Sequence, residues 1–176
     1  MACELNNYTK GACAENGGIE EMYVYSIADR TSYTLTSGVV TDIVLANGTK
    51  AVTWTPDMES ATAGEVTTRS RENNSVFQAQ TALITFKDDS DVTVDIVNQV
   101  SRGFLGVIVK KAMADGSSQY RHLGLINGMT VETAEGVLGQ LYEDLRGHTL
   151  NLVGKELTKA PSVLDTIIAE ILVPIS

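Results

Sequence analysis

The dominant pattern in this sequence is a series of short apolar or alternating runs separated by glycine, asparagine and serine. From residue 19 onward, β-branched and aromatic residues fill these runs, which is typical of strands. The cleanest case is residues 148–153, where polar and apolar positions alternate and predict a strand with one buried face. The runs that predict strands are 22–25, 39–45, 50–54, 75–86, 104–110, 120–126 and 148–153. The pattern therefore predicts a mostly β fold, a β-sandwich or barrel, with one or two α-helices.

A tight hairpin is predicted between residues 39–45 and 50–54. Asn47-Gly48 lies between these two runs, and this dipeptide readily adopts the positive φ angles of a two-residue hairpin turn. Trp54 ends the second run, and we expect it to anchor the core.

The segment 57–86 predicts a long hairpin. Residues 58–72 are rich in Thr and Ser, Asn73-Asn74 interrupts them, and 75–86 returns with strand character. Two arms of ~12 residues each would span ~40 Å. A lone ribbon that is polar on both faces is marginal in water, so another chain would have to cover it. The alternative is two ordinary strands within a sandwich, and the sequence leaves both interpretations open.

A helix is predicted over residues 90–102. Ser90 and the aspartates around it are typical of a helix N-terminus, and Gly103 suits the position after the last turn. The apolar residues at helical spacing are Val92, Ile96, Val97 and Val100.

The C-terminal segment 161–176 predicts an amphipathic helix, with a strand as the alternative. Ser162 and Asp165 resemble a capping box. The apolar positions with helical spacing are Leu164, Ile167, Ile168, Ile171 and Leu172.

Two further segments complete the predicted organisation. Residues 1–18 are polar and glycine-rich, which indicates an N-terminal arm before a β domain at 19–160. Residues 128–145 contain spaced glycines, and we expect Val137, Leu138, Leu141 and Leu145 to be buried there.

Charge and composition reduce the number of protein classes to which this chain could belong. The 176 residues carry a net charge of −9, which argues against a protein that grips nucleic-acid phosphates. No apolar run approaches the ~18 residues of a membrane span. The first residues lack the pattern of a secretory signal, so we expect Cys3 and Cys13 to remain thiols in a reducing compartment.

The sequence nominates no catalytic, cofactor or metal site. His122 and His148 lie in no recognisable nucleophile motif, and Ser117-Ser118 beside Gly116 is typical of a turn. The aspartates at 88, 89, 91 and 95 lack the spacing of an EF-hand loop, and a helix N-terminus accounts for them. A carbohydrate-binding sandwich would need a row of aromatic residues that this chain does not show.

Several segments together resemble the major tail tube proteins of long-tailed bacteriophages. The most specific is the run from Arg146 to Glu156, which is similar to the N-G-Y-T-L-T-x-x-G-x-E strand of that family, with Arg146 and His148 departing from its Asn and Tyr. The other matching features are Met1-Ala2-Cys3, Gly17-Gly18-Ile19, the hairpin, the helix at 90–102 and the strand pair 104–111/119–127.

This resemblance implies a structural subunit of the virion tail, assembled in the host cytoplasm. Such subunits form rings of six that stack into a hollow tube for genome delivery, and their hairpin reaches the neighbouring ring. Implied partners are further copies and the tape-measure, baseplate or hub and terminator proteins, while DNA passes without specific binding. The net charge leads us to expect an acidic lumen. The alternatives are a terminator or hub protein with the same fold, or the tube subunit of a contractile injection system.

Ten residues are candidates for contacts between subunits. They lie on the hairpin and on the C-terminal segment, the two parts expected to meet other chains. They are Glu65, Thr67, Arg69, Arg71, Glu72, Asn74, Phe77, Ile167, Ile168 and Ile171.

Overall fold

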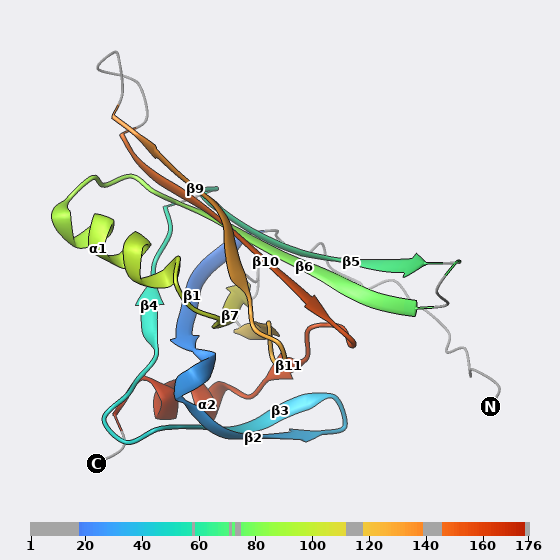
Figure 1. Cartoon of the computed structure of the whole chain (residues 1–176). Coiled ribbons are helices and arrows are strands. Elements are labelled where there is room, and N and C mark those ends of the chain that lie inside the picture. Colours follow the sequence, from blue (N-terminus) through green and yellow to red (C-terminus); the bar gives the residue numbers. More distant parts are fainter. Residues whose placement is uncertain are drawn as a thin grey trace, which may run out of the picture.

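The computed structural model describes residues 18–57, 59–70, 72, 75–111, 118–138 and 146–174, and it shows two β-sheets and two α-helices (Figure 1). The larger sheet, in the order β2-β3-β11-β8-β7-β1-β4, contains β1 (Ile19–Ser26), β2 (Arg30–Thr36), β3 (Val39–Leu45), β4 (Val52–Trp54), β7 (Leu105–Lys111), β8 (Gln119–Leu123) and β11 (Ser162–Val163). The smaller sheet, in the order β5-β6-β10-β9, contains β5 (Ala61–Ser70), β6 (Ser75–Phe86), β10 (Gly147–Glu156) and β9 (Thr130–Val137). The helices are α1 (Asp91–Val100) and α2 (Asp165–Ile171), with a 3-10 turn, η1, at Ile27–Asp29. The predicted mostly β fold is confirmed.

The main core lies between the two sheets. Strand alternation sends Met22 and Val24 of β1 toward the smaller sheet, where Ile84 of β6 and Leu150 of β10 meet them. Trp54 is buried in the same cluster and packs edge-on against Phe86, so its predicted role as a core anchor is confirmed.

A second core lies on the other face of the larger sheet, which α2 covers. Tyr23 and Tyr25 of β1 point into it, opposite to their even-numbered neighbours. Ile167, Ile168 and Ile171 of α2 are buried in this core. The helix predicted in the C-terminal segment is confirmed over 165–171, but its apolar face packs on its own chain. These three isoleucines are therefore withdrawn as candidates for contacts between subunits.

The start of α2 differs from the predicted capping box. Ser162 lies in β11, the N-cap residue is Leu164, and no side chain caps the helix there. The reason is that Ser162 and Val163 pair with both β3 and β8, which extends the chain up to Leu164.

The predicted hairpin between 39–45 and 50–54 is wrong. β3 pairs with β2 and β11, whereas β4 pairs with β1 at the far edge of the sheet. The hairpin turn is instead Ser37-Gly38, with φ angles of 52° and 79°, which joins β2 to β3. Positive φ at both central residues is the geometry that matches the twist of a two-residue hairpin, and Gly38 adopts it without strain.

Residues 130–137 form strand β9, which the sequence did not predict. Val137 and Leu138 were expected to be buried but are 43% and 76% exposed, because β9 is an edge strand with β10 as its neighbour. Leu141 and Leu145 lie outside the described residues.

Helix α1 begins as predicted and ends differently. The Ser90 hydroxyl accepts a hydrogen bond from the Thr93 N–H, which is the expected N-cap. The buried face contains Thr93 and Val100, while Val92 is 68% exposed. Gly103 does not adopt a positive φ, so the predicted glycine stop is wrong. The helix ends at Ser101, whose N–H bonds to the Val97 carbonyl in an ordinary right-handed conformation.

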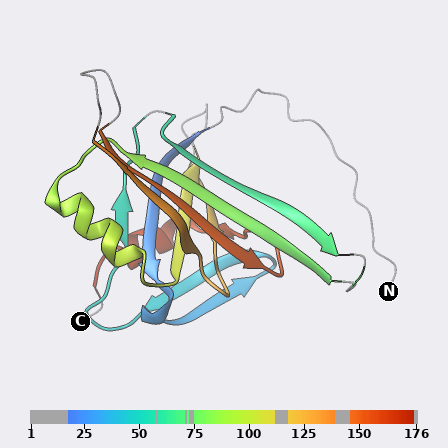
Figure 2. The ribbon, with the colours of Figure 1, turned by 45° about the horizontal axis from the view of Figure 1, so that its top comes forward.

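The hairpin predicted at 57–86 is confirmed as β5 and β6. One part of it is an ordinary part of a sheet, and another part is a projecting ribbon. β6 pairs with β10 from Gln78 to Phe86, so most of this strand is interior to a sheet. β5 lies at the sheet edge and is exposed along most of its length (Figure 2). Only the pairs Thr68↔Phe77, Arg69↔Val76 and Ser70↔Ser75 extend past the last β10 pair, a projection of ~10 Å rather than ~40 Å.

Candidate assembly surface

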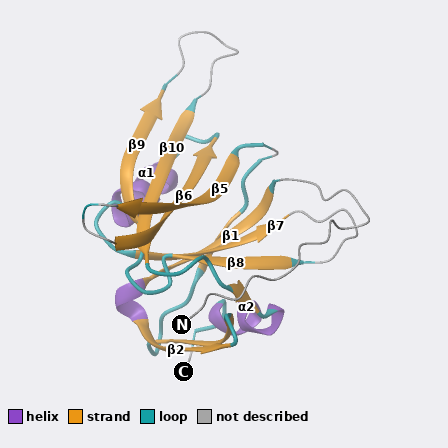
Figure 3. Cartoon of the chain, turned by 90° about the vertical axis from the view of Figure 1, so that its right-hand side faces the viewer, coloured by secondary structure: helices purple, strands orange, loops and turns teal. Residues whose placement is uncertain are grey.

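The smaller sheet has one face on the core, and no element of the described part of the chain covers its other face, which we call its free face. Threonine is the commonest residue on it, interspersed with apolar residues such as Val66, Leu83 and Val137, and Figure 3 shows how this sheet stands apart from the larger one. The threonines that the register places on it are Thr62, Thr68, Thr81, Thr85, Thr130, Thr133 and Thr149. Charge on this face comes from Glu132, Glu135 and Lys155. It is therefore a nearly neutral polar surface.

Both edges of the smaller sheet are open within the described part of the chain. β5 forms one edge and β9 the other, and each pairs on one side only. Residues 62–69 and 132–137 along these edges are exposed. Unpaired strand edges present N–H and C=O groups that readily add another strand.

The distal end of the hairpin combines exposed apolar and charged residues. Val76 is 46% exposed there and Val66, which pairs with Ala79 just below this end, is 65% exposed, although β-branched residues bury well in sheets. Phe77 is half-buried, with the Lys155 ammonium 5.3 Å from its ring centre. This end offers an apolar contact that its own chain does not cover.

The candidate contact residues on the hairpin fall into two groups: some form hydrogen bonds within their own chain, and others are exposed at the distal end. Glu65 accepts a hydrogen bond of 2.8 Å from the Ala160 N–H, and the Thr67 hydroxyl donates one of 2.7 Å to Oε1 of the Gln78 side chain. Arg69 and Glu72 are exposed at the distal end. Arg71 and Asn74 lie outside the described residues.

A groove of about 560 Å³ opens beneath β5, between the two sheets. Its apolar wall includes Ala61, Ala63, Val109 and Leu123. Its polar lining includes Lys111, Arg121 and Lys159, together with the Glu65 carboxylate. The two alanines on β5 leave this side of the sandwich without large side chains to fill it.

The core face of the smaller sheet holds the 124–128 loop through contacts that sequence reasoning missed. The Glu156 carboxylate accepts hydrogen bonds from the N–H groups of Ile126 and Asn127, and Gln80 accepts one from Gly124. These bonds hold the 124–128 loop against the middle of β6 and the end of β10. The signal available in the sequence was Glu156 itself, a carboxylate at the end of an alternating strand.

Gly147 starts β10 at a point that admits no side chain. A Cβ atom there would lie 1.9 Å from the Phe86 carbonyl oxygen, and its φ is 153°. The close approach brings the start of β10 to the end of β6.

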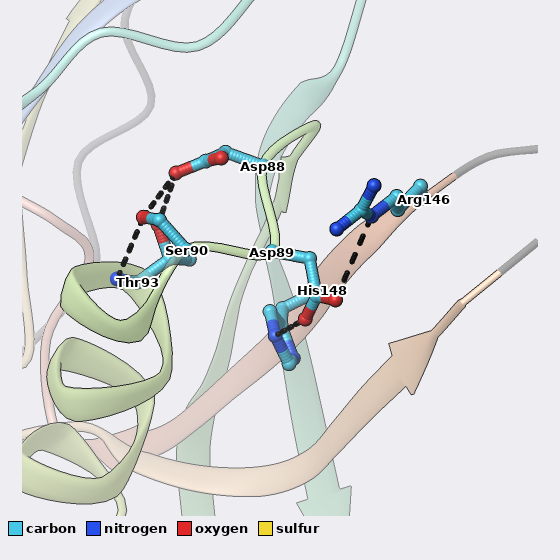
Figure 4. A network of polar contacts seen from close by, with 6 residues as sticks. All are labelled: Asp88, Asp89, Ser90, Thr93, Arg146 and His148. Carbon is cyan, nitrogen blue, oxygen red and sulfur yellow. Dashed lines mark hydrogen bonds and ion pairs between the residues drawn. The ribbon is translucent and has the colours of Figure 1, made fainter.

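The aspartates near residue 90 act in a helix-capping network (Figure 4). Asp88 accepts hydrogen bonds from the hydroxyls of Ser90 and Thr93, which lower the pKa of its carboxyl group. Asp89 contacts His148 Nε2 at 3.1 Å and Arg146 Nε at 3.6 Å, which joins the α1 N-terminus to β10. Among the residues with described positions, no three metal-ligating side chains gather into a potential metal site.

His122 pairs with a tyrosine rather than with a serine. Its Nε2 lies 2.7 Å from the Tyr25 hydroxyl in the second core. Burial lowers the pKa of His122 to about 3 and raises the pKa of Tyr25 to about 12, so both are neutral at physiological pH. The arrangement serves core packing.

No family model, curated protein or solved structure matches this chain. Within the described ranges, neither α-helix has the length or the apolar run needed to cross a bilayer. The function proposed below therefore rests on the geometry of the assembly surface.

Proposed function

We propose that this protein is a structural subunit that assembles side by side into rings, and that the rings stack into the tube of a phage tail through which the genome passes. The observation that supports this proposal is the pair of open edges, β5 and β9, on opposite sides of one four-stranded sheet. A head-to-tail contact between two different surfaces of the same protein generates a closed ring when the rotation closes.

The directions of the strands favour closure of the smaller sheets of several copies into one barrel. Every neighbouring pair in the sheet β5-β6-β10-β9 is antiparallel, so β9 runs opposite to β5. A copy rotated about an axis along the strands would add its β5 to β9 in antiparallel fashion, and the pattern would continue around the ring. A closed barrel leaves no strand edge unpaired.

The size of such a barrel suits a conduit. Six copies, the number that the resemblance implies, would contribute twenty-four strands. At ~4.8 Å between strands, the circumference is at least ~115 Å and the diameter at least ~37 Å. This would be wide enough to pass a nucleic-acid duplex.

The free face would line the lumen, because the larger sheet and α2 occupy the other side. Its two glutamates and one lysine leave one net negative charge per copy at this wall, far less than the whole-chain charge of −9. The expected acidic lumen is replaced in this proposal by a hydroxyl-lined, nearly neutral wall. Without clustered Lys or Arg, such a wall would not retain phosphates by counterion release.

Assembly of the purified full chain tests the proposal. We expect sedimentation velocity to show a concentration-dependent shift from monomer to a ring-sized species, and negative-stain microscopy to show rings or tubes with a central channel. A protein that stays monomeric at millimolar concentration, with both sheet edges protected from hydrogen exchange, would contradict it.

A further inference from the structure

The two sides of the sandwich are closed differently. On the β9 side, α1 packs against β9 and β10 (Figure 2), and its buried Val100 belongs to the main core between the sheets. On the β5 side the groove remains open within the described part of the chain, and Ala63 at its wall is exposed. One side of the molecule thus carries a helix beyond its sheet edge, and the other carries a hollow beneath its sheet edge.

The groove is basic around an apolar wall. Lys111, Arg121 and Lys159 line it, and Glu65 is the carboxylate among its lining residues. Arg121 donates to the Ala160 carbonyl and Lys111 to the Gln119 side chain, so both keep hydrogen-bonded positions. Lys159 is exposed and forms no ion pair with any residue whose position is described. An acidic partner with some apolar surface would match this site.

The outward face of α1 has that chemistry. Asp91 and Asp95 are exposed on it, and the helix contains no basic residue. Val92 and Val94, which flank the aspartates, are 68% and 37% exposed. The cations nearest the helix N-terminus are already paired, Lys87 with Asp57 and Arg146 with Asp89.

We propose that the outward face of α1 docks into the groove beneath β5 of the next copy. This inference rests on the proposed ring, because contact between β9 of one copy and β5 of the next brings α1 to the groove. The helix would close the open side of the neighbouring sandwich, and its aspartates would meet the groove cations. The ring contact would then have two layers, a strand pair on the lumen side and a helix in a groove behind it.

Charge reversal with rescue tests the docking on the full chain. Asp95→Lys alone and Lys159→Glu alone should each weaken assembly about tenfold by sedimentation velocity, because like charges then face each other across the contact. The variant with both changes should assemble within about threefold of the unmodified protein, because the pair is restored. Glu170→Lys, at an exposed position on α2, is the matched control and should leave assembly unchanged.

Carbodiimide cross-linking of an assembled mixture of isotope-labelled and unlabelled copies gives an independent readout. We expect mixed-isotope peptides that join Asp91 or Asp95 to Lys111 or Lys159. Rings that form normally in both single variants and lack this cross-link would overturn the helix docking and leave the proposed function intact. Cross-links from the groove lysines to Glu4 or Glu15 would also overturn it, since the N-terminal arm would then occupy the groove. Failure of the unmodified protein to assemble would overturn both proposals.

Discussion

Glu156 shows how a single side chain can support a surface that it does not belong to. It is 3% exposed, and one of its carboxylate oxygens accepts the N–H groups of two consecutive loop residues, Ile126 and Asn127. Both hydrogen bonds are partly buried, so an N–H group that loses this acceptor costs free energy to the extent that water cannot replace it. The loop packed on the core side of the smaller sheet therefore depends on this carboxylate.

We predict that Glu156→Ala lowers the free energy of unfolding by about 1–3 kcal/mol, because two loop amides lose their acceptor. Urea denaturation of the purified chain measures this. Glu132→Ala is the matched control, since the Asn151–Glu132 hydrogen bond is exposed and its loss should change stability by less than about 0.5 kcal/mol. Equal effects of the two substitutions would contradict the assigned role.

The buried His122 should make stability depend on pH. Its pKa is about 3 in the folded protein and about 6.5 when exposed in the unfolded chain. Between these values the unfolded state binds one more proton than the folded state, so the stability contributed by neutral His122 is present above pH 6.5 and is lost as the pH falls toward 3.

We predict that His122→Gln flattens the pH dependence of the unfolding free energy between pH 4 and 6 by up to about 1.4 kcal/mol per pH unit. Comparing the two proteins by urea denaturation at each pH removes the shared contribution of the carboxylates. His148→Gln, at the partly buried Asp89 contact, is the comparison that tests whether the effect is specific to His122. Parallel pH profiles for the original protein and His122→Gln would contradict this prediction.

At the scale of elements, the hairpin has a structural part and a projecting part. Gln78 and Gln80 are buried, and Gln80 holds the 124–128 loop, so β6 belongs to the core from Gln78 onward. The pairs beyond Thr67↔Gln78 have no third strand beside them in the described sheet, and Lys155 over the Phe77 ring is a side-chain contact to them from β10. In the proposed tube, this distal end is the part available to reach the next ring.

We predict that replacing residues 68–77 with Asn-Gly gives a folded protein that forms rings but not tubes. The Thr67↔Gln78 pair would then be closed by a two-residue turn of the favoured type. Circular dichroism and thermal denaturation check the fold, and negative-stain microscopy distinguishes rings from tubes. Tubes of normal length from this variant would exclude the distal hairpin from stacking.

At the scale of the whole molecule, charge is distributed unevenly. The free face carries two carboxylates and one ammonium group, while the chain has nine more acidic than basic residues. Most of the acidic excess therefore lies elsewhere. In the proposed tube, the wall facing the genome would be nearly neutral, with one net negative charge per copy, and repulsion between assembled copies would act mainly outside it.

We predict that Thr81→Lys, on the free face of β6, gives tubes of normal dimensions that retain duplex DNA at low salt. A ring of added ammonium groups would release counterions from the phosphates, so retention should fall steeply as salt rises. Co-sedimentation of tubes with linear DNA measures this, and Thr81→Gln and Glu170→Lys are the controls for size and for an added charge elsewhere. Equal retention by Thr81→Lys and Glu170→Lys would indicate that the free face does not line the channel.

The sequence by itself determined the features that depend on neighbouring residues. Alternation in 148–153 predicted β10 because side chains on a strand alternate between faces whatever their partner. Ser90 predicted the start of α1 because an N-cap needs only an N–H three residues away. The mostly β character and the helix at 165–171 followed from the same local periodicities.

The tertiary structure alone decided which strands pair, which edges stay open and which apolar faces are already covered. Asn47-Gly48 forms a turn, yet β4 pairs with β1, because strand choice depends on contacts between residues far apart in the chain. The isoleucines of α2 have the periodicity of an interface, and only the second core shows that their own sheet buries them. Periodicity tells that a face must be buried, whereas the partner that buries it is set by the packing of the whole chain.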